Sequence, residues 1–329
     1  TNSIMKTPTN SIMKTPKKTP LFFPLLIGAL AVSNLVASSD DTSYGGWKSS
    51  RIGGGGYIVD LIPTSNAQVY YTHTDVGGFY RSDDGGATWR MLQGALPATR
   101  GNQEPRSLVV DPRDPNTILV ANGSHWQNTR EGVFRSTDGG QTFERTLEAA
   151  FAGNGNERMW GRVLAVDPNN PDVVLAGSMG DGVFRSADFG KTWQNVGLDK
   201  TNPTDIKFDT LTKGRVLLTS RPYRFFLLGK SDVVLNPGFF ESTDSGKTWS
   251  ALITDKNAPF EMLQAPAAFG HDWIAIFPPC NVMRSKDGGH TWSPFEEGLP
   301  QDTAGHKANI IDASGVITPW GSICLLYTS

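Results

Sequence analysis

The stretch SADFGKTW, residues 186–193, decides the fold, because four more copies of its pattern occur along the chain. The pattern is Ser-x-Asp-x-Gly-x-Thr-aromatic, and the other copies are SDDGGATW (82–89), STDGGQTF (136–143), STDSGKTW (242–249) and SKDGGHTW (285–292). Successive copies begin 54, 50, 56 and 43 residues apart. Repetition at such a period is typical of an architecture built from one repeated supersecondary unit.

Each copy, which we call an Asp box, lies between two predicted strands. An apolar segment such as Val183-Phe184-Arg185 leads into the box, and the closing aromatic begins the next strand. Ser and Asp side chains bond backbone N–H groups in such turns, and Gly adopts the φ values that they require. A second pair of strands precedes several boxes, as at 107–112 and 117–121. Four short strands per period predict an all-β fold, a β-propeller of four-stranded blades.

The number of blades follows less directly from the repeat. Five boxes account for five blades, and residues 306–320 could open another. The last residues, 322–329, do not match the repeat. We therefore expect a propeller spanning 40–329 that is incomplete at its C-terminus.

The carboxylates of the five boxes are expected to be structural. They are distributed one per blade, whereas a catalytic constellation converges on one point. The residues concerned are Asp84, Asp138, Asp188, Asp244 and Asp287.

The N-terminal segment resembles an export signal. Residues 1–8 are repeated letter for letter at 9–16, and lysines 14, 17 and 18 precede an apolar run from Leu21 to Val36. Small residues follow at 37–39 as a cleavage zone. We read 1–39 as a duplicated leader with a secretory signal peptide, and expect a secreted protein with no membrane anchor after cleavage. In an oxidising compartment Cys280 and Cys324 could pair.

Charge and residue spacing narrow the range of partners. The formal net charge is -2 and the pI is about 6.2, so the chain lacks the basic field of a nucleic-acid-binding domain. Its five histidines show no metal-ligand spacing, and no nucleotide-binding loop occurs. We expect no metal, no cofactor and no nucleic acid, and a neutral polymer such as a polysaccharide fits this balance.

Two neighbouring stretches exceed what the repeat requires. Gly53-Gly54-Gly55-Gly56-Tyr57 precedes a strand, and four glycines permit a close backbone approach or make a tight turn. In Tyr71-Thr72-His73-Thr74-Asp75-Val76-Gly77-Gly78, a strand gives way to a turn at Asp75. In extended geometry His73 would share a face with Asp75. The alternative is that Asp75 only caps its turn.

Two aromatic residues outside the boxes, Trp126 and Trp160, are candidates for stacking on sugar rings. Packing between blades is the alternative for each.

The combination of these motifs carries a family resemblance. IGGGGYI (52–58) followed by YTHTDVGGFYRS (71–82) resembles the opening of family 74 glycoside hydrolases, which are xyloglucanases and reducing-end-specific xyloglucan cellobiohydrolases. The likeness covers about residues 45–200 and continues beyond them mainly as Asp boxes. It implies a secreted hydrolase of the β-1,4-glucan backbone of xyloglucan or a related polysaccharide, with the exact polysaccharide and endo or exo action left open. Gly55, Gly56, Tyr57, His73, Trp126 and Trp160 are then candidate substrate-binding residues.

Members of this family are similar in having two seven-bladed propellers that supply one aspartate each. The resemblance implies that Asp75 is the general base, and that the proton donor belongs to a second propeller whose motif no segment here matches. Inversion needs both carboxyl groups, roughly 6.5–9.5 Å apart. Asp60 and Glu104 are conceivable substitutes for the donor. His73 stands where the family pattern has arginine, a departure that bears on the choice of substrate.

Two other functions remain as alternatives. A non-catalytic Asp-box propeller could serve as a binding or assembly module, which the missing proton donor would favour. A sialidase also carries Asp boxes, but the chain lacks the early Arg-Ile-Pro-like motif of those enzymes.

Overall fold

The computed structural model describes residues 50, 52–124, 130–151, 153–155, 161–225, 233–265, 272–278, 281–295, 310–318 and 321–328. The chain divides into residues 1–49 and 50–329, and all described residues belong to the second unit. The expected leader (1–39), Trp126, Trp160 and Cys280 lie outside the described residues. Within the described ranges, no helix is long and apolar enough to cross a membrane.

The described residues form five four-stranded antiparallel sheets, one for each Asp box. Blade 1 contains β1 (Ile58–Pro63), β2 (Tyr70–Thr74), β3 (Gly78–Ser82) and β4 (Arg90–Met91). Blade 2 contains β5 (Pro105–Asp111), β6 (Asp114–Asn122), β7 (Gly132–Ser136) and β8 (Glu144–Leu147). Blade 3 contains β9 (Leu164–Val166), β10 (Val174–Ser178), β11 (Gly182–Ser186) and β12 (Gln194–Asn195). Blade 4 contains β13 (Pro203–Phe208), β14 (Val216–Ser220), β17 (Gly238–Ser242) and β18 (Ser250–Ile253). Blade 5 contains β19 (Glu261–Gln264), β20 (Trp273–Phe277), β21 (Asn281–Ser285) and β22 (Ser293–Pro294).

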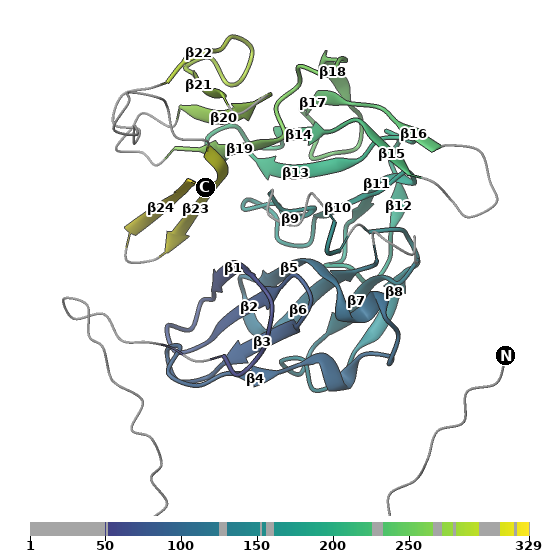
Figure 1. The fold of residues 1–329 in the computed structure, drawn as a ribbon, viewed down its shortest axis with the longest axis vertical. Coiled ribbons are helices and arrows are strands. Elements are labelled where there is room, and N and C mark those ends of the chain that lie inside the picture. The colour runs from purple at the N-terminus through teal and green to yellow at the C-terminus, as the bar shows by residue number, and fades with distance from the viewer. Residues whose placement is uncertain are drawn as a thin grey trace, which may run out of the picture. The chain divides into compact units, whose positions relative to one another are not determined.

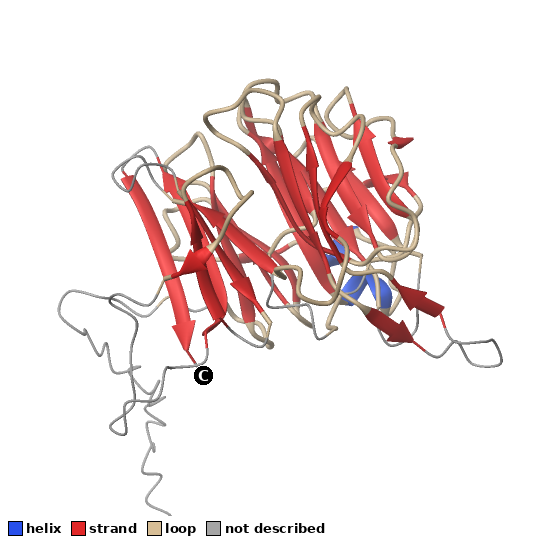
Figure 2. Ribbon diagram, turned by 90° about the horizontal axis from the view of Figure 1, so that it is seen from above, coloured by secondary structure: helices blue, strands red, loops and turns tan. Residues whose placement is uncertain are grey.

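The blades follow one another in chain order around an arc (Figure 1). Seen from above, their strands form successive separate layers, and the blue segments are the short 3-10 helices η1 (Gln93–Ala95) and η2 (Gly101–Gln103) between blades 1 and 2 (Figure 2). A hairpin of β15 (Tyr223–Phe225) and β16 (Val233–Leu235) is inserted in blade 4 between β14 and β17. A last hairpin pairs β23 (Ile310–Thr318) with β24 (Gly321–Thr328).

The apolar core consists of layers between neighbouring blades. Between blades 1 and 2, for example, Tyr71 and Phe79 pack with Leu108 and Ile118, and all four side chains are fully buried. The closing aromatic of each box packs on the layer that faces the preceding blade: Phe143, Trp193, Trp249 and Trp292 in blades 2 to 5. Each of these four boxes therefore links its own hairpin to the blade before it.

The boxes themselves form one repeated hydrogen-bond pattern. In blade 2, the Ser136 hydroxyl donates to Asp138 Oδ1 at 2.8 Å and accepts from the Gly140 N–H, while the Thr142 hydroxyl donates to Asp138 Oδ2 at 2.6 Å. These hydrogen bonds outweigh partial burial and lower the pKa of Asp138 to about 2. The same bonds recur in all five boxes. These carboxylates are thus engaged by their own turns, as a structural role requires.

The predicted all-β fold and the four-stranded blades are confirmed. The part of the chain that the structure describes forms five blades, and the seven-bladed pattern and the incomplete C-terminus stay predictions. The segment 322–329, which does not match the repeat, contributes strand β24 to the last hairpin.

Candidate functional site

The glycine run (53–56) and the turn that contains Asp75 lie in contact at one end of blade 1, although a strand and a loop separate them in the sequence. The Tyr57 N–H donates to Asp75 Oδ1 at 2.8 Å, and the Asp75 N–H donates to the Tyr57 carbonyl at 3.1 Å. Strand β2 ends at Thr74 and β3 begins at Gly78, so Asp75 lies in the tight turn between them. Its side chain is therefore oriented by the backbone that follows the glycines, and it keeps 9% of its surface exposed.

The contacts of the glycines explain why side chains are missing here. A Cβ on Gly54 would lie 1.9 Å from the Tyr80 hydroxyl, and one on Gly56 would lie 2.6 Å from Asp75 Oδ1. On the other segment, a Cβ on Gly77 would lie 2.3 Å from the Gly55 carbonyl oxygen. Contacts this close leave no room for any side chain. The glycine run therefore packs directly against the backbone of the turn and against the side chains of Tyr80 and Asp75.

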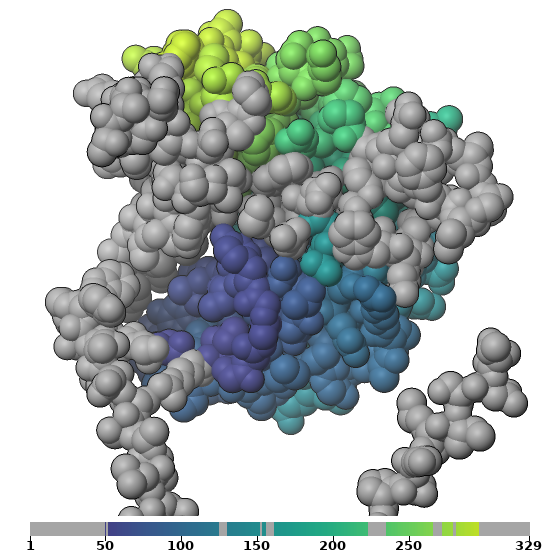
Figure 3. Space-filling model, in the orientation of Figure 1, coloured from purple at the N-terminus to yellow at the C-terminus, as the bar shows by residue number. Residues whose placement is uncertain are grey.

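The other two glycines of the run face open space. A Cβ on Gly53 or Gly55 would meet no atom within 4 Å. Beside them the Tyr57 side chain is 40% exposed and Val76, in the turn, is 44% exposed. The start of the described chain, purple in the space-filling view, reaches the molecular surface on the face that Figure 3 presents. The run thus packs on one side and leaves a surface without side chains on the other, next to Asp75 and an aromatic ring.

His73 lies beneath this surface. Its side chain is 1% exposed, and its ring centroid lies 5.7 Å from that of Phe79. Burial lowers the pKa of His73 to about 4, against an opposing influence of the nearby Asp60 charge, so the imidazole is neutral at neutral pH. Strand β2 ends at Thr74, so the extended geometry behind the expectation that His73 shares a face with Asp75 does not continue to Asp75. This burial keeps the His73 side chain from the surface of the described residues, and its predicted role in substrate binding stays a prediction.

Charged residues on the first strands of the blades join the blades near the centre of the arc. Asp60 of β1 forms an ion pair with Arg162 at 2.5 Å. Arg106 of β5, 3% exposed, donates to the carbonyls of Gly161 and Thr204. The Asp60–Arg162 pair therefore joins blade 1 to the segment just before blade 3, and the bond from Arg106 to Thr204 joins blade 2 to blade 4.

The same kind of link continues towards blade 5. Asp205 of β13 is fully buried and accepts from the backbone N–H groups of Arg162 and Met262, both at 3.0 Å. Glu261 of β19 accepts from the Gly161 N–H at 3.1 Å. The backbone of residues 161 and 162 is therefore held by carboxylates of blades 4 and 5.

The two suggested substitutes for a proton donor are both engaged by arginines. Asp60 is paired with Arg162, and the buried Glu104 accepts from Arg100 Nε at 3.3 Å. The Asp60 pair links distant segments, whereas the Glu104 pair joins residues four positions apart. Each carboxylate also has a second, buried oxygen without a hydrogen-bond partner among the described residues, and the suggestion that either group acts as the acid stays a prediction.

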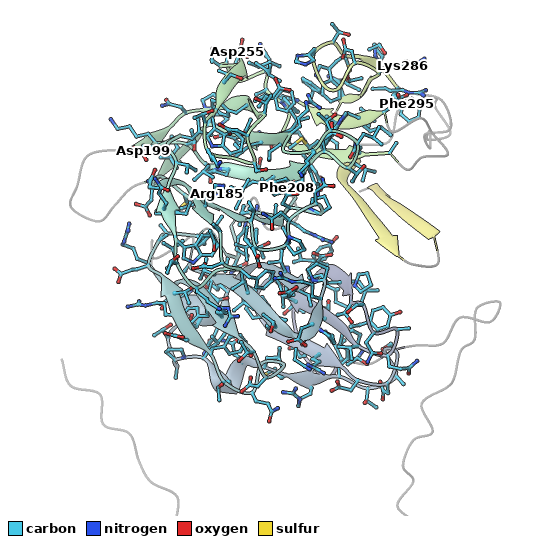
Figure 4. The ribbon with its side chains drawn as sticks, turned by 180° about the vertical axis from the view of Figure 1, so that it is seen from behind. Arg185, Asp199, Phe208, Asp255, Lys286 and Phe295 are labelled. Atoms are coloured by element: carbon cyan, nitrogen blue, oxygen red, sulfur yellow. The ribbon has the colours of Figure 1, made fainter. Side chains whose placement is uncertain are left out.

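A cavity of about 490 Å³ lies along the first strands of blades 1 to 4, and on β1 it lies at the end away from the Asp75 turn. It is lined mainly by apolar residues of β1, β5, β9 and β13, with Arg162 and Lys207 among them. Figure 4 labels one lining residue, Phe208, towards the middle of the arc, whereas Asp255 and Lys286 lie at its outer edge. Ile62 and Pro63 of β1 reach the cavity, but Ile58, at the other end of this strand, pairs with Thr74 beside the Asp75 turn. The cavity and the candidate site are therefore separate.

Tyr80 and Thr74 are site residues that sequence reasoning missed. The Tyr80 hydroxyl donates to the Gly77 carbonyl at 3.0 Å, and the Thr74 hydroxyl accepts from the Gly77 N–H at 2.7 Å. One signal could have pointed to Tyr80: the corresponding residues before the other boxes are Phe134, Phe184, Phe240 and Met283. In the part of the chain that the structure describes, no group of three or more His, Cys, Asp or Glu side chains is arranged to hold a metal ion.

Comparison with known proteins supports both the repeat and the family resemblance. The model of the BNR/Asp-box repeat matches residues 80–91. The chain is 30% identical to a xyloglucanase of Paenibacillus sp over 91% of its own length and 37% of that protein. It is 29% identical to the xyloglucanase Xgh74A of Acetivibrio thermocellus over 82% of its own length and 35% of that protein. The chain thus spans little more than a third of the length of these curated relatives.

A solved structure gives the same result at the level of the fold. The chain superimposes on the GH74 xyloglucanase of Xanthomonas campestris with a TM-score of 0.63 and 24% identity, over 81% of this chain and 41% of that one. Together with the 30% identity to the Paenibacillus xyloglucanase, this agreement of fold confirms the family resemblance stated from the sequence.

Proposed function

We propose that this chain, which belongs to glycoside hydrolase family 74, binds the β-1,4-glucan backbone of xyloglucan or a related plant cell-wall polysaccharide and contributes Asp75 to its hydrolysis. The observation that carries the proposal is the contact between the glycine run and the Asp75 turn. The Tyr57 N–H bonds the Asp75 carboxylate and the Tyr57 carbonyl accepts from the Asp75 backbone N–H, next to a surface without side chains.

In this proposal Asp75 is the general base of an inverting reaction. The base takes a proton from the attacking water while an acid protonates the leaving oxygen. The Tyr57 N–H engages Oδ1, which fixes the direction of the carboxylate. Such fixed orientation is a main source of catalytic efficiency. As the family resemblance implies, the proton donor would come from a second propeller.

Substrate binding is assigned to the open side of the glycine run. Gly55, whose Cβ position is open, lets a sugar ring approach the backbone, Gly56 keeps the run close to Asp75, and the exposed Tyr57 ring provides an aromatic face beside them. Aromatic rings with one apolar and one wet side are suited to such contacts. Secretion, which the N-terminal segment predicts, would bring the protein to a polymer that lies outside cells.

The test must measure the role of Asp75 as a base in a reaction that needs no proton donor. A xyloglucan oligosaccharide glycoside with a 2,4-dinitrophenyl leaving group needs no protonation of that group, so a chain that supplies only the base can still hydrolyse it. We expect the protein spanning 40–329 to release dinitrophenol, and Asp75→Asn to reduce kcat by roughly 100-fold or more while leaving oligosaccharide affinity nearly unchanged.

A matched control is Asp83→Asn, because the Asp83 side chain is 57% exposed at the box end of the same blade. This variant should hydrolyse the glycoside like the parent. Well-folded parent protein that neither binds xyloglucan oligosaccharides nor hydrolyses the activated glycoside would contradict the proposal. Binding without hydrolysis would leave a carbohydrate-binding propeller and remove the catalytic role of Asp75.

A further inference from the structure

At one position of its third strand, blade 1 has a hydroxyl group where the other four described blades have an apolar side chain. The residue two positions before the box serine is Tyr80 in blade 1, but Phe134, Phe184, Phe240 and Met283 in blades 2 to 5. An apolar side chain therefore suffices for packing at this position of the repeat. The hydroxyl occurs in the one described blade whose second and third strands are joined by the Asp75 turn, so packing does not account for it.

The hydroxyl of Tyr80 lies between the two segments of the candidate site. The side chain is 1% exposed, and its hydroxyl donates to the Gly77 carbonyl at 3.0 Å. On the other side, the backbone of Gly54 packs so closely on this oxygen that a Cβ there would lie 1.9 Å away. One buried atom thus contacts both the turn and the glycine run.

We propose that Tyr80 is a positioning residue, whose hydroxyl fixes the glycine run against the Asp75 turn and thereby sets the direction of the Asp75 carboxylate. The link to Asp75 runs through Tyr57, because the Tyr57 N–H bonds Asp75 Oδ1 and Tyr57 directly follows the run. Displacement of the run would move this donor. The catalytic part of this inference rests on the proposed function of Asp75, whereas the structural part does not.

Burial supports the role of the hydroxyl as a donor. Removal from water raises the pKa of Tyr80, so the phenol stays protonated in the neutral range and can donate to the Gly77 carbonyl. Removing the hydroxyl should leave the ring in place, because four other blades pack an apolar residue there. The Gly77 carbonyl would lose its hydrogen-bond donor, and the Gly54 backbone would lose its contact with the Tyr80 hydroxyl oxygen.

The test is Tyr80→Phe in the protein spanning 40–329, with Tyr71→Phe as the matched control. Tyr71 is an equally buried tyrosine on the neighbouring strand, but its hydroxyl donates to Pro115 O at 2.7 Å and accepts from Arg81, away from the glycine run. Amide hydrogen exchange would be followed in peptides covering 52–57 and 74–80. Hydrolysis of the activated glycoside would be measured in parallel, with kcat and KM determined separately.

We expect Tyr80→Phe to unfold at nearly the parent temperature. We also expect exchange in 52–57 to be about tenfold faster and kcat to fall roughly 10- to 100-fold with little change in KM. Tyr71→Phe should leave both exchange in 52–57 and kcat as in the parent.

Exchange that is unchanged in Tyr80→Phe would overturn the proposal, as would faster exchange without any loss of kcat. A parent protein that is itself inactive would contradict the proposed function of Asp75. It would also overturn the catalytic role of Tyr80, while exchange would still decide whether the hydroxyl holds the two segments together.

Discussion

The carboxylate of Asp60 on the first strand of blade 1 lies 2.5 Å from the guanidinium of Arg162, just before the first strand of blade 3. This ion pair bypasses blade 2 and joins two blades that do not share a sheet or an apolar layer. The Asp60 side chain is 8% exposed and that of Arg162 is 31% exposed, so the pair is only partly screened by water.

Breaking this ion pair should lower the stability of the fold while leaving the contacts of the Asp75 turn unchanged. We expect Asp60→Asn to lower the free energy of unfolding by about 1–3 kcal/mol, less than for a fully buried pair because Arg162 retains contact with solvent. The pair between Arg113 and Asp172, in which both side chains are about half exposed, provides the control. Asp172→Asn should cost less than about 1 kcal/mol. Urea unfolding of both variants measures the difference, and equal losses would show that the Asp60 pair has no special role.

The two sides of the glycine run should respond differently to a single methyl group. Gly54→Ala places a Cβ against the Tyr80 hydroxyl, whereas Gly55→Ala places one in open space, and neither residue has a positive φ. We expect Gly55→Ala to unfold like the parent but to bind xyloglucan oligosaccharides several-fold more weakly, because the methyl group occupies the surface assigned to the sugar.

Gly54→Ala should instead lower the unfolding temperature, because the run must move away from Tyr80. Thermal unfolding and calorimetric titration with a xyloglucan oligosaccharide measure the two effects on each variant. If a stable Gly55→Ala variant bound the oligosaccharide with unaltered affinity, the open side of the glycine run would not be the sugar-binding surface.

The buried His73 should make stability depend on pH. Its pKa is about 4 in the folded protein, against 6.5 for an ordinary histidine. Between these pH values His73 is protonated in the unfolded chain but neutral in the folded chain. The free energy of unfolding therefore falls as the pH decreases from 6.5 towards 4. The loss amounts to about 3 kcal/mol for this shift.

His73→Gln removes the titrating group while retaining a polar side chain of similar size. Urea unfolding at several pH values should therefore give a shallower decline below pH 6.5 for this variant than for the parent. Two parallel curves would show that His73 is not the group responsible.

Much of the fold could be predicted from short segments of sequence. The Asp-box bonds join residues two to four positions apart, such as Ser136 with Asp138 and Thr142 with Asp138, so eight residues suffice to specify each hairpin. The strand lead-ins repeat with the same spacing, and the blade follows from the repeat. The candidate site was predicted in part, because the glycine run and the TDVGG turn are both unusual within the repeat.

The sequence by itself thus determined the blades, their Asp boxes and the two segments that flank Asp75. Only the tertiary structure decided what those segments touch. The Tyr57 bond to Asp75 spans 18 residues and the Asp60–Arg162 pair spans 102, so both depend on how strands and blades pack. The burial of His73 and the contact of Tyr80 with Gly54 have the same origin. Local hydrogen bonds can be recognised in a short pattern, whereas a contact between distant segments exists only once the apolar layers have placed the strands side by side.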